Sequence, residues 1–203
     1  MIGTKKIERC PWAGLDGTEY ARYHDEEWGV PMTEDRALFE KLTLEGFQAG
    51  LSWLTILRKR ENFRKAFHNF DAERIARFTE RDVTRLMNDA GIIRNRAKIE
   101  ATISNAKAYL ALSERIAFSQ YIWGFLEGRP IVNRLASIKD AATETDVSKR
   151  MSKALKADGF RFVGSTTLYA FMQSTGMVND HIVTCFRHAE CAKLQKKLKI
   201  ADL

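Results

Sequence analysis

A histidine and a cysteine near the C-terminal end of the chain have the types and spacing of metal ligands. His181 and Cys185 stand four residues apart in the segment VNDHIVTC. On a helix this spacing would place both side chains on one face, where they can share a metal ion. Two ligands do not complete a tetrahedral site, so the others must come from elsewhere in the chain.

Further ligand candidates lie at the opposite end of the chain. Cys10 and His24 occur in the segments RCPW and YHDEEWG. Together with the C-terminal pair they would form a closed set of two cysteines and two histidines, which is typical of structural zinc because no position remains for a reacting water. The spacing alone leaves two alternatives open: His188 or Cys191 replaces one ligand, or the side chains bind no metal.

A glutamate among apolar residues is the second candidate for chemistry. Glu45 lies in TLEGFQAGLSW, a segment that also holds Trp53. A carboxylate in such a segment either faces solvent, which is the usual case, or is held in a pocket. Tyr23 and Trp28 supply aromatic rings from another part of the chain, EYARYHDEEWG. These rings belong to the core, to the wall of such a pocket, or to both.

The segment LKADGFRFVGSTTLYAFM has the pattern of a helix-hairpin-helix. Gly159 ends one expected helix and Gly164 precedes the next, and glycine permits a turn that side chains would block. The first backbone amides of the second helix would be free to bind a phosphate oxygen, with help from the helix dipole. An ordinary helical corner would give the same pattern.

These candidates need a scaffold, and helical spacing dominates the chain. Only three prolines occur, and no run of alternating residues indicates a sheet. Apolar residues at helical spacing predict helices near 38–47 and from residue 96 to about 110. Capping signals predict further boundaries: Asp71 before AERIARF, Thr79 with Asp82 before a helix ended by Gly91, Asp146 before a helix closed by Gly159, and a last core helix over 165–174 ended by Gly176. We therefore expect an all-α protein with eight or more helices, in which 127–145 connects two lobes.

Charge and composition indicate the class of protein. Lysine and arginine outnumber aspartate and glutamate by 33 to 26, which favours a polyanionic partner such as nucleic acid. RKRENFRK (58–65) and IIRNRAK (92–98) are either phosphate contacts or plain basic surface, and KLQKKLKI is expected to be a solvated end.

No apolar run approaches the ~18 residues of a membrane span, and the first residues lack the core of a signal peptide. Three cysteines, an odd number, suit a reducing compartment, so we expect a cytoplasmic protein without membrane association.

Taken together, these motifs resemble those of the DNA-3-methyladenine glycosylase I family of bacterial alkylation-repair enzymes. The matching segments follow the family order from about residue 8 to 186: ERCPW, YHDEEWGVP, LEGFQAGLSW, AGIIRNRAKI, GFRFVGSTTLYAFMQSTG and VNDHIVTC. The resemblance implies a helix-hairpin-helix glycosylase fold. Residues 1–203 would form a single domain of two helical lobes with a cleft between them, and zinc would clamp its termini together.

Site residues carry over from this resemblance position by position. They imply one structural zinc ion per chain, bound by Cys10, His24, His181 and Cys185. They also imply a base pocket: Glu45 as the catalytic glutamate, Tyr23 as the stacking tyrosine, Trp53 as the pocket tryptophan and Trp28 in its lining. For DNA contacts they imply Leu51, which would fill the gap left in the duplex, with Gly50 beside it and Gly164 and Ser165 at the hairpin.

The implied activity is hydrolysis of the N-glycosidic bond of 3-methyladenine in double-stranded alkylated DNA by a monomeric enzyme without lyase activity. Methylation at N3 makes the base a cation and a good leaving group, so a carboxylate opposite the sugar is dispensable. Other branches of the superfamily place a catalytic aspartate where this chain has Asn179, and Asp180 is expected to point elsewhere. The flipped base would be sandwiched by Tyr23 and Trp53, and its amino edge would donate to Glu45.

Three other functions compete with this interpretation. A non-catalytic, zinc-stabilised helix-hairpin-helix module would bind DNA without the pocket residues. An iron–sulfur glycosylase of the endonuclease III kind needs four cysteines for its cluster, and this chain has three. A zinc hydrolase would need an open coordination position, which a closed ligand set does not provide.

Overall fold

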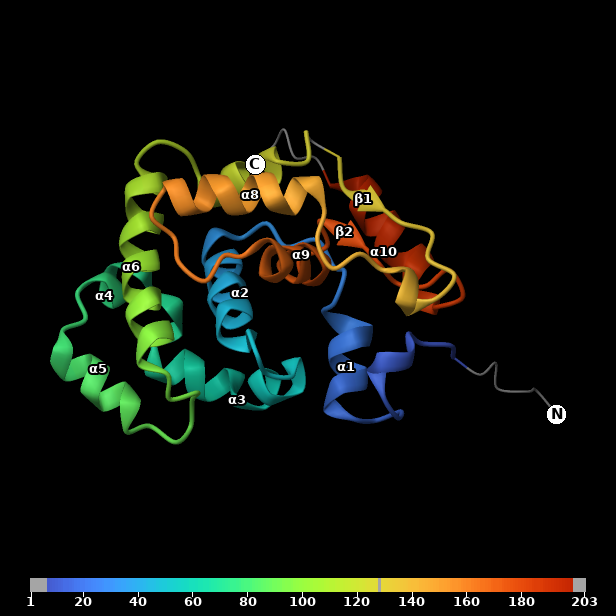
Figure 1. Ribbon diagram of the computed structural model, residues 1–203. Helices are drawn as coiled ribbons and strands as arrows, with labels where there is room; N and C mark the ends of the chain where they lie inside the picture. Colours follow the sequence, from blue (N-terminus) through green and yellow to red (C-terminus); the bar gives the residue numbers. More distant parts are fainter. Residues whose placement is uncertain (1–6, 128, 199–203) are drawn as a thin grey trace.

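The computed structural model describes residues 7–127 and 129–198, and this part of the chain is mostly helical (Figure 1). Its ten α-helices are α1 (Glu19–Glu26), α2 (Asp35–Gln48), α3 (Trp53–Ala66), α4 (Ala72–Ala76), α5 (Glu80–Met87), α6 (Arg96–Ser113), α7 (Phe118–Gly124), α8 (Asp146–Ala157), α9 (Ser165–Ser174) and α10 (Phe186–Lys197). Shorter elements join them: the 3-10 helices η1 (Pro11–Ala13), η2 (His68–Phe70) and η3 (Ile138–Asp140), and the strands β1 (Ile131–Val132) and β2 (Val178–Asn179). Within the described residues, no helix has the length and apolar character needed to span a membrane.

Helix α2 lies in the middle of the fold and contacts α3, α6, α7 and α9 (Figure 1). From residue 41 to residue 47 every one of its side chains is buried. A helix that is covered on all sides has no polar face to offer solvent. The polar side chains in this stretch, among them Lys41 and Glu45, are therefore held inside the protein.

The end of α2 is fixed by a lysine from α6. Lys98 Nζ donates to the carbonyl oxygens of Phe47 at 2.9 Å and Ala49 at 2.7 Å, which satisfies carbonyls that the helix leaves without partners. Gly50 then turns the chain with φ +84°. The Ser52 hydroxyl caps α3 by accepting from the next turn. The result is a tight α2–α3 corner on which Leu51 is exposed and Trp53 begins a helix that faces inward.

The N-terminal segment of the described chain lies beside the start of α10. Strands β1 and β2 pair in parallel, with Ile131 opposite Val178. The backbone N–H of Phe186 donates to the carbonyl of Glu8 at 3.0 Å. Figure 1 accordingly shows α1, the strand pair and α10 on the same side of the molecule.

Most of the expected helix boundaries are confirmed. Asp71 caps α4, and Thr79 with Asp82 forms the capping box of α5. Helix α6 begins at residue 96, and α9 spans 165–174 as expected. Gly176 follows α9 with φ +71°, a conformation that favours glycine.

Three expectations are corrected by the structure, and one further stretch is described in more detail. Helix α5 ends at Met87 rather than at Gly91. Thr145, not Asp146, caps α8, because the Thr145 hydroxyl accepts from the Ser148 amide. The chain continues into α10 beyond the predicted last helix, so most of KLQKKLKI is helical; residues 199–203 lie outside the described part. The stretch 127–145 holds a short strand and a 3-10 helix, whereas Gly128 is not described.

Replacing Gly176 by alanine should lower the free energy of unfolding by about 3 kcal/mol. A Cβ at this position would lie 2.4 Å from the backbone nitrogen of Pro31, and the positive φ adds strain of about 1–2 kcal/mol. Urea unfolding followed by circular dichroism measures the loss. Gly17→Ala is the matched control, because Gly17 has φ +75° and nothing within 4 Å of its Cβ position. Equal losses in the two variants would contradict the packing argument.

Candidate functional site

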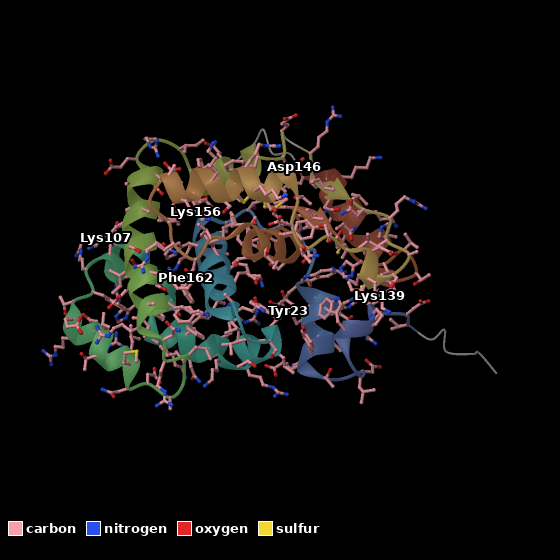
Figure 2. All side chains as sticks on the ribbon, in the orientation of Figure 1. Tyr23, Lys107, Lys139, Asp146, Lys156 and Phe162 are labelled. Atoms are coloured by element: carbon pink, nitrogen blue, oxygen red, sulfur yellow. The ribbon has the colours of Figure 1, made fainter. Side chains whose placement is uncertain are left out.

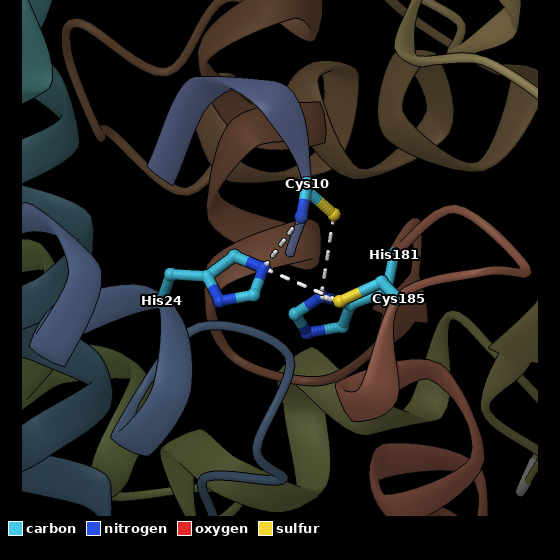
Figure 3. Close-up of side chains that lie close together, drawn as sticks. All are labelled: Cys10, His24, His181 and Cys185. Carbon is cyan, nitrogen blue, oxygen red and sulfur yellow. Dashed lines mark hydrogen bonds between the residues drawn. The ribbon is translucent and has the colours of Figure 1, made fainter. Parts of the chain in front are cut away.

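Cys10, His24, His181 and Cys185 form a buried group, called here the Cys/His cluster (Figure 3). Their ligand atoms all lie within 4.8 Å of one another. Three sulfur–nitrogen distances are each 3.5 Å: Cys10 Sγ to His181 Nδ1, Cys185 Sγ to His24 Nε2, and Cys185 Sγ to His181 Nδ1. Tetrahedral zinc with ordinary Zn–S and Zn–N bond lengths would separate sulfur and nitrogen by about 3.5 Å. The residues present therefore fit a zinc ion.

The outer nitrogen of each histidine ring faces a hydrogen-bond acceptor. His24 Nδ1 lies 2.8 Å from Asp25 Oδ1, and His181 Nε2 lies 3.1 Å from the carbonyl oxygen of Trp28. Each acceptor calls for a proton on the nitrogen beside it, which leaves the lone pair of the other nitrogen directed into the cluster. Arg9 donates in turn to Asp25 and holds that carboxylate in place.

The two thiols of the cluster have opposite pKa shifts. Hydrogen bonding to Cys10 lowers the pKa of Cys185, and the same contact raises the pKa of Cys10. A thiolate at Cys185 is favoured as a result, and the thiolate is the form that binds metals.

The C-terminal half of the cluster lies in a turn, so the helix envisaged for His181 and Cys185 is wrong. Both residues fall between β2 and α10, and the N–H of Cys185 closes the turn on the carbonyl of Ile182 at 2.9 Å. The two alternative ligands lie outside the cluster. His188 contacts the carbonyl of residue 133 instead, and Cys191 is buried next to the carbonyl of residue 28.

Next to the cluster is a cavity of about 240 Å³, called here the aromatic cavity. Its rings come from four parts of the chain: Trp12 from η1, Tyr20 and Tyr23 from α1, Trp28 from the segment after α1, and Trp53 from α3. Glu45, Gln48, Gln173 and Ser174 add polar groups to the wall. The cavity unites Tyr23, Trp28, Glu45 and Trp53, four residues that the sequence singled out, and it adds Trp12, Tyr20, Gln173 and Ser174, which the sequence analysis missed.

Glu45 is the buried carboxylate of this cavity. Glu45 is 3% exposed, which excludes the alternative that its carboxylate faces solvent. Oε1 accepts from the Ser174 hydroxyl at 3.1 Å and lies 3.2 Å from Lys41 Nζ. Among the described residues, Oε2 has no hydrogen-bond partner, so this oxygen is available to a ligand.

Lys41 is a buried charge that the sequence analysis missed. Its Nζ donates to the Tyr23 hydroxyl at 2.9 Å and lies 3.5 Å from the centroid of the Trp53 ring. Burial lowers the pKa of Lys41 to about 8, although Glu45 acts in the opposite direction. The sequence held a signal, because Lys41 and Glu45 are four residues apart in one helix and share a face.

The rings of Tyr23 and Trp53 contact each other. Their centroids are 5.4 Å apart and the planes are tilted by 40°. A base stacked between two rings would need a separation of about 7 Å, twice the usual contact distance. The expected sandwich is therefore not open in this structure, and a ligand must separate the rings or contact them from the cavity side.

A short turn joins α8 to α9 where the sequence predicts a hairpin. Gly164 caps α9 and Ser165 begins it, but the Ser165 hydroxyl donates to Glu144 instead of being free. Phe162, at the turn, has φ +57° and packs against α2 at Gly46. Figure 2 shows Phe162 on one side of α2 and Tyr23 on the other. The hairpin and the aromatic cavity thus lie on either side of the same helix.

Asp180 is fully buried and engaged within the fold. It accepts from Asn133 Nδ2, Tyr169 Oη and Gln173 Nε2, each at 2.7 Å. Burial, followed by this contact with Asp180, raises the pKa of Tyr169. The side chain of Asn179 donates to the carbonyl of His188. Neither Asn179 nor Asp180 lines the aromatic cavity.

Comparison with known proteins places the chain among characterised sequences and folds. A family profile described as methyladenine glycosylase matches residues 12–188. A DNA-3-methyladenine glycosylase from Haemophilus influenzae is 52% identical over 178 residues, 87% of this chain and 96% of the relative. DNA-3-methyladenine glycosylase 1 from Escherichia coli is 50% identical over 180 residues, 88% of this chain and 96% of the relative.

Solved structures agree with this result. A crystal structure of 3-methyladenine DNA glycosylase I superposes with a TM-score of 0.86 at 52% identity, covering 88% of this chain and 98% of the other. A structure that describes 3-methyladenine recognition by 3-methyladenine DNA glycosylase I from Staphylococcus aureus superposes with a TM-score of 0.83 at 37% identity. The match covers 86% of this chain and 94% of the other.

Replacing Asp180 by asparagine should lower the free energy of unfolding by about 3 kcal/mol. Three donors converge on the carboxylate, and an amide would turn its own donor toward one of them. Urea unfolding of the variant measures this loss. Asp158→Asn is the matched control, since Asp158 also accepts from a tyrosine but its side chain is 24% exposed, so the expected loss is below about 1 kcal/mol. A loss no larger at residue 180 than at residue 158 would refute the argument.

Proposed function

The chain belongs to the methyladenine glycosylase family, and we propose that it releases 3-methyladenine from alkylated DNA by hydrolysing the N-glycosidic bond. One observation carries this proposal: a buried carboxylate, Glu45, has a free oxygen and lies in the wall of an aromatic cavity. Relatives named for this activity, at 50–52% identity over nearly their whole length, support the same conclusion. The reaction is a step of base-excision repair.

The aromatic cavity would receive the base after it leaves the duplex. Methylation at N3 makes the base a cation, and a cation over an aromatic face gains about 0.5–2 kcal/mol. Tyr23 and Trp53 would contact it on the side that faces the cavity, with Trp28 in the lining. Glu45 Oε2 would accept from the amino edge of the base, and such a charge-assisted hydrogen bond is about twice as strong as a neutral one. Neutral adenine lacks the cation–aromatic attraction and makes a weaker hydrogen bond to Glu45, so both interactions favour the damaged base.

The bond to a cationic base needs little further help to break. Among the described residues that line the aromatic cavity, Glu45 is the single acid. Asp180 is held by three donors and is not in the lining. Selection of the flipped base, rather than a second carboxylate opposite the sugar, therefore carries the specificity. A non-catalytic DNA-binding module would not need a buried carboxylate with a free oxygen.

For DNA, we propose a helix-hairpin-helix arrangement of two lobes with a cleft between them. Leu51 is 39% exposed at the α2–α3 corner, where an apolar side chain can enter the space that the flipped base leaves. Gly50 next to it allows close approach of the backbone. At the hairpin, the amides of Gly164 and Ser165 would contact a phosphate through the N-terminal end of α9. The net charge of +7 favours these phosphate contacts.

We also propose that Cys10, His24, His181 and Cys185 bind one structural zinc ion. Four protein ligands leave no position for water, so the metal would supply stability and take no part in the reaction. It would fasten the segment before α1 to the turn before α10. Because Tyr23 is next to His24 in the chain, this fastening would also hold one wall of the aromatic cavity.

Replacing Glu45 by glutamine should lower the rate of 3-methyladenine release about 100-fold, because an amide loses the charge that the cationic base needs. Incubation with methylated DNA and chromatography of the free base measure the rate. Glu61→Gln is the control, since the Glu61 side chain is 71% exposed on α3. Undiminished release by the Glu45 variant, in a sample whose circular dichroism matches the native protein, would remove this residue from the mechanism.

Purified protein should contain about one zinc ion per chain by elemental analysis. Cys185→Ser should lower both the zinc content and the melting temperature, because the loss of one ligand weakens metal binding that is coupled to folding. Cys191→Ser is the matched control, a buried thiol outside the cluster. A folded native sample without metal would count against the zinc proposal.

A further inference from the structure

The ammonium of Lys41 contacts three of the residues that form the aromatic cavity. It lies 3.2 Å from Glu45 Oε1, 2.9 Å from the Tyr23 hydroxyl and 3.5 Å from the centroid of Trp53. Lys41 is 7% exposed, so bulk water has little access to its ammonium. One buried cation therefore connects the carboxylate and two aromatic rings, which come from three different helices.

Lys41 lies behind the aromatic cavity rather than in it. A second cavity of about 300 Å³, called here the rear cavity, is lined by Lys41, and it shares Tyr23, Trp53 and Ser174 with the aromatic cavity. The charged and titratable groups around the ammonium come from α1 and the residue after it, from α2 and from α3: Tyr23, Glu26, Glu27, Glu40, Glu45, Arg60 and Arg64. Glu26 is exposed, Glu27 is paired with Arg60, and Glu40 is paired with Arg64, so Glu45 is the buried carboxylate that pairs with Lys41.

We propose that the Lys41 ammonium is a positioning residue for base excision, because it holds Glu45, Tyr23 and Trp53 in the arrangement that receives the damaged base. This inference rests on the function proposed above. It adds a residue to the machinery of that reaction and makes the reaction depend on the charge of a buried lysine.

Hydrogen-bond chemistry determines what the ammonium does at each contact. A protonated lysine has three donors and no acceptor, so the Tyr23 oxygen must accept from it and direct its own proton elsewhere. The contact with Oε1 fixes the Glu45 carboxylate and leaves Oε2 for the base. The cation over Trp53 holds that ring from the rear cavity. A neutral amine gives up the ion pair and leaves a buried carboxylate without its cation.

Loss of the Lys41 proton falls in an accessible pH range. Burial lowers the pKa of Lys41 from 10.5 to about 8. Excision should therefore decline as the pH rises through about 8. Stability should respond in the opposite direction: between about pH 8 and the ordinary pKa the unfolded chain binds more protons at this lysine, so this group makes the free energy of unfolding rise with pH. The titration of Lys41 therefore does not cause unfolding at alkaline pH, and circular dichroism at each pH checks that the protein stays folded.

The test compares single-turnover excision by the native protein and by Lys41→Met from about pH 7 to about pH 9.5, after subtraction of spontaneous base loss. The native rate should fall about tenfold or more across this range. At about pH 7 the Lys41→Met rate should be lower than the native rate by about tenfold or more and should change little with pH, because methionine fills the space without a charge. Lys107→Met is the matched control on an exposed face of α6, and it should keep the native rate and pH profile.

Each outcome decides the proposal. A native alkaline decline that persists unchanged in Lys41→Met, or a variant with the native rate at about pH 7, would overturn the role of Lys41 while leaving the glycosylase function intact. No release of base by the native protein at any pH would instead overturn the proposed function. If Lys41→Met does not fold, NMR titration of the lysine Nζ groups in the native protein replaces the variant. The proposal would be refuted if no lysine titrated at the pH, near 8, at which the excision rate declines.

Discussion

The burial of two opposite charges on one turn of α2 is the constraint on which the rest of the site depends. Glu45 and Lys41 are both inside the protein, and an ion removed from water needs partners with good geometry. Tyr23 and Ser174 supply hydrogen bonds from α1 and α9, and the Trp53 ring of α3 covers the ammonium. Helices α1, α3 and α9 therefore all pack against α2 at these two charges. Glu45, Tyr23, Trp53 and Ser174, which make these contacts, also line the aromatic cavity.

A second constraint comes from the Cys/His cluster, which lies next to the same cavity. Trp28 belongs to both, since its carbonyl contacts His181 while its ring lines the aromatic cavity. Trp12 likewise packs against both His24 and Trp28. The region that would be fixed by metal and the region that would receive the base therefore share residues. Stability at the cluster and geometry at the cavity are properties of one connected structure.

Sequence patterns predicted what local chemistry determines. The carboxylates of Asp71 and Asp82 cap helices because each accepts from an amide only three residues away, and such contacts can be read directly from the chain. Motif resemblance selected Glu45, Tyr23 and Trp53, which do line one cavity. The patterns failed where distant segments decide the outcome. The turn at His181, the contact between the rings of Tyr23 and Trp53, and the role of Lys41 all depend on packing between helices that no local pattern records.

The contact between the N-terminal segment and the turn before α10 has a consequence for how the protein is made. Cys10 Sγ and His181 Nδ1 are 3.5 Å apart although 171 positions separate the two residues in sequence. While the chain emerges from the ribosome, Cys10, His24 and Trp28 are synthesised long before His181 and Cys185, so their contacts with that turn form last. The Cys/His cluster is consequently completed only after residues 181–185 have been synthesised. A chain truncated before them lacks the contact between the rings of Trp28 and His181 and exposes apolar surface, which favours aggregation.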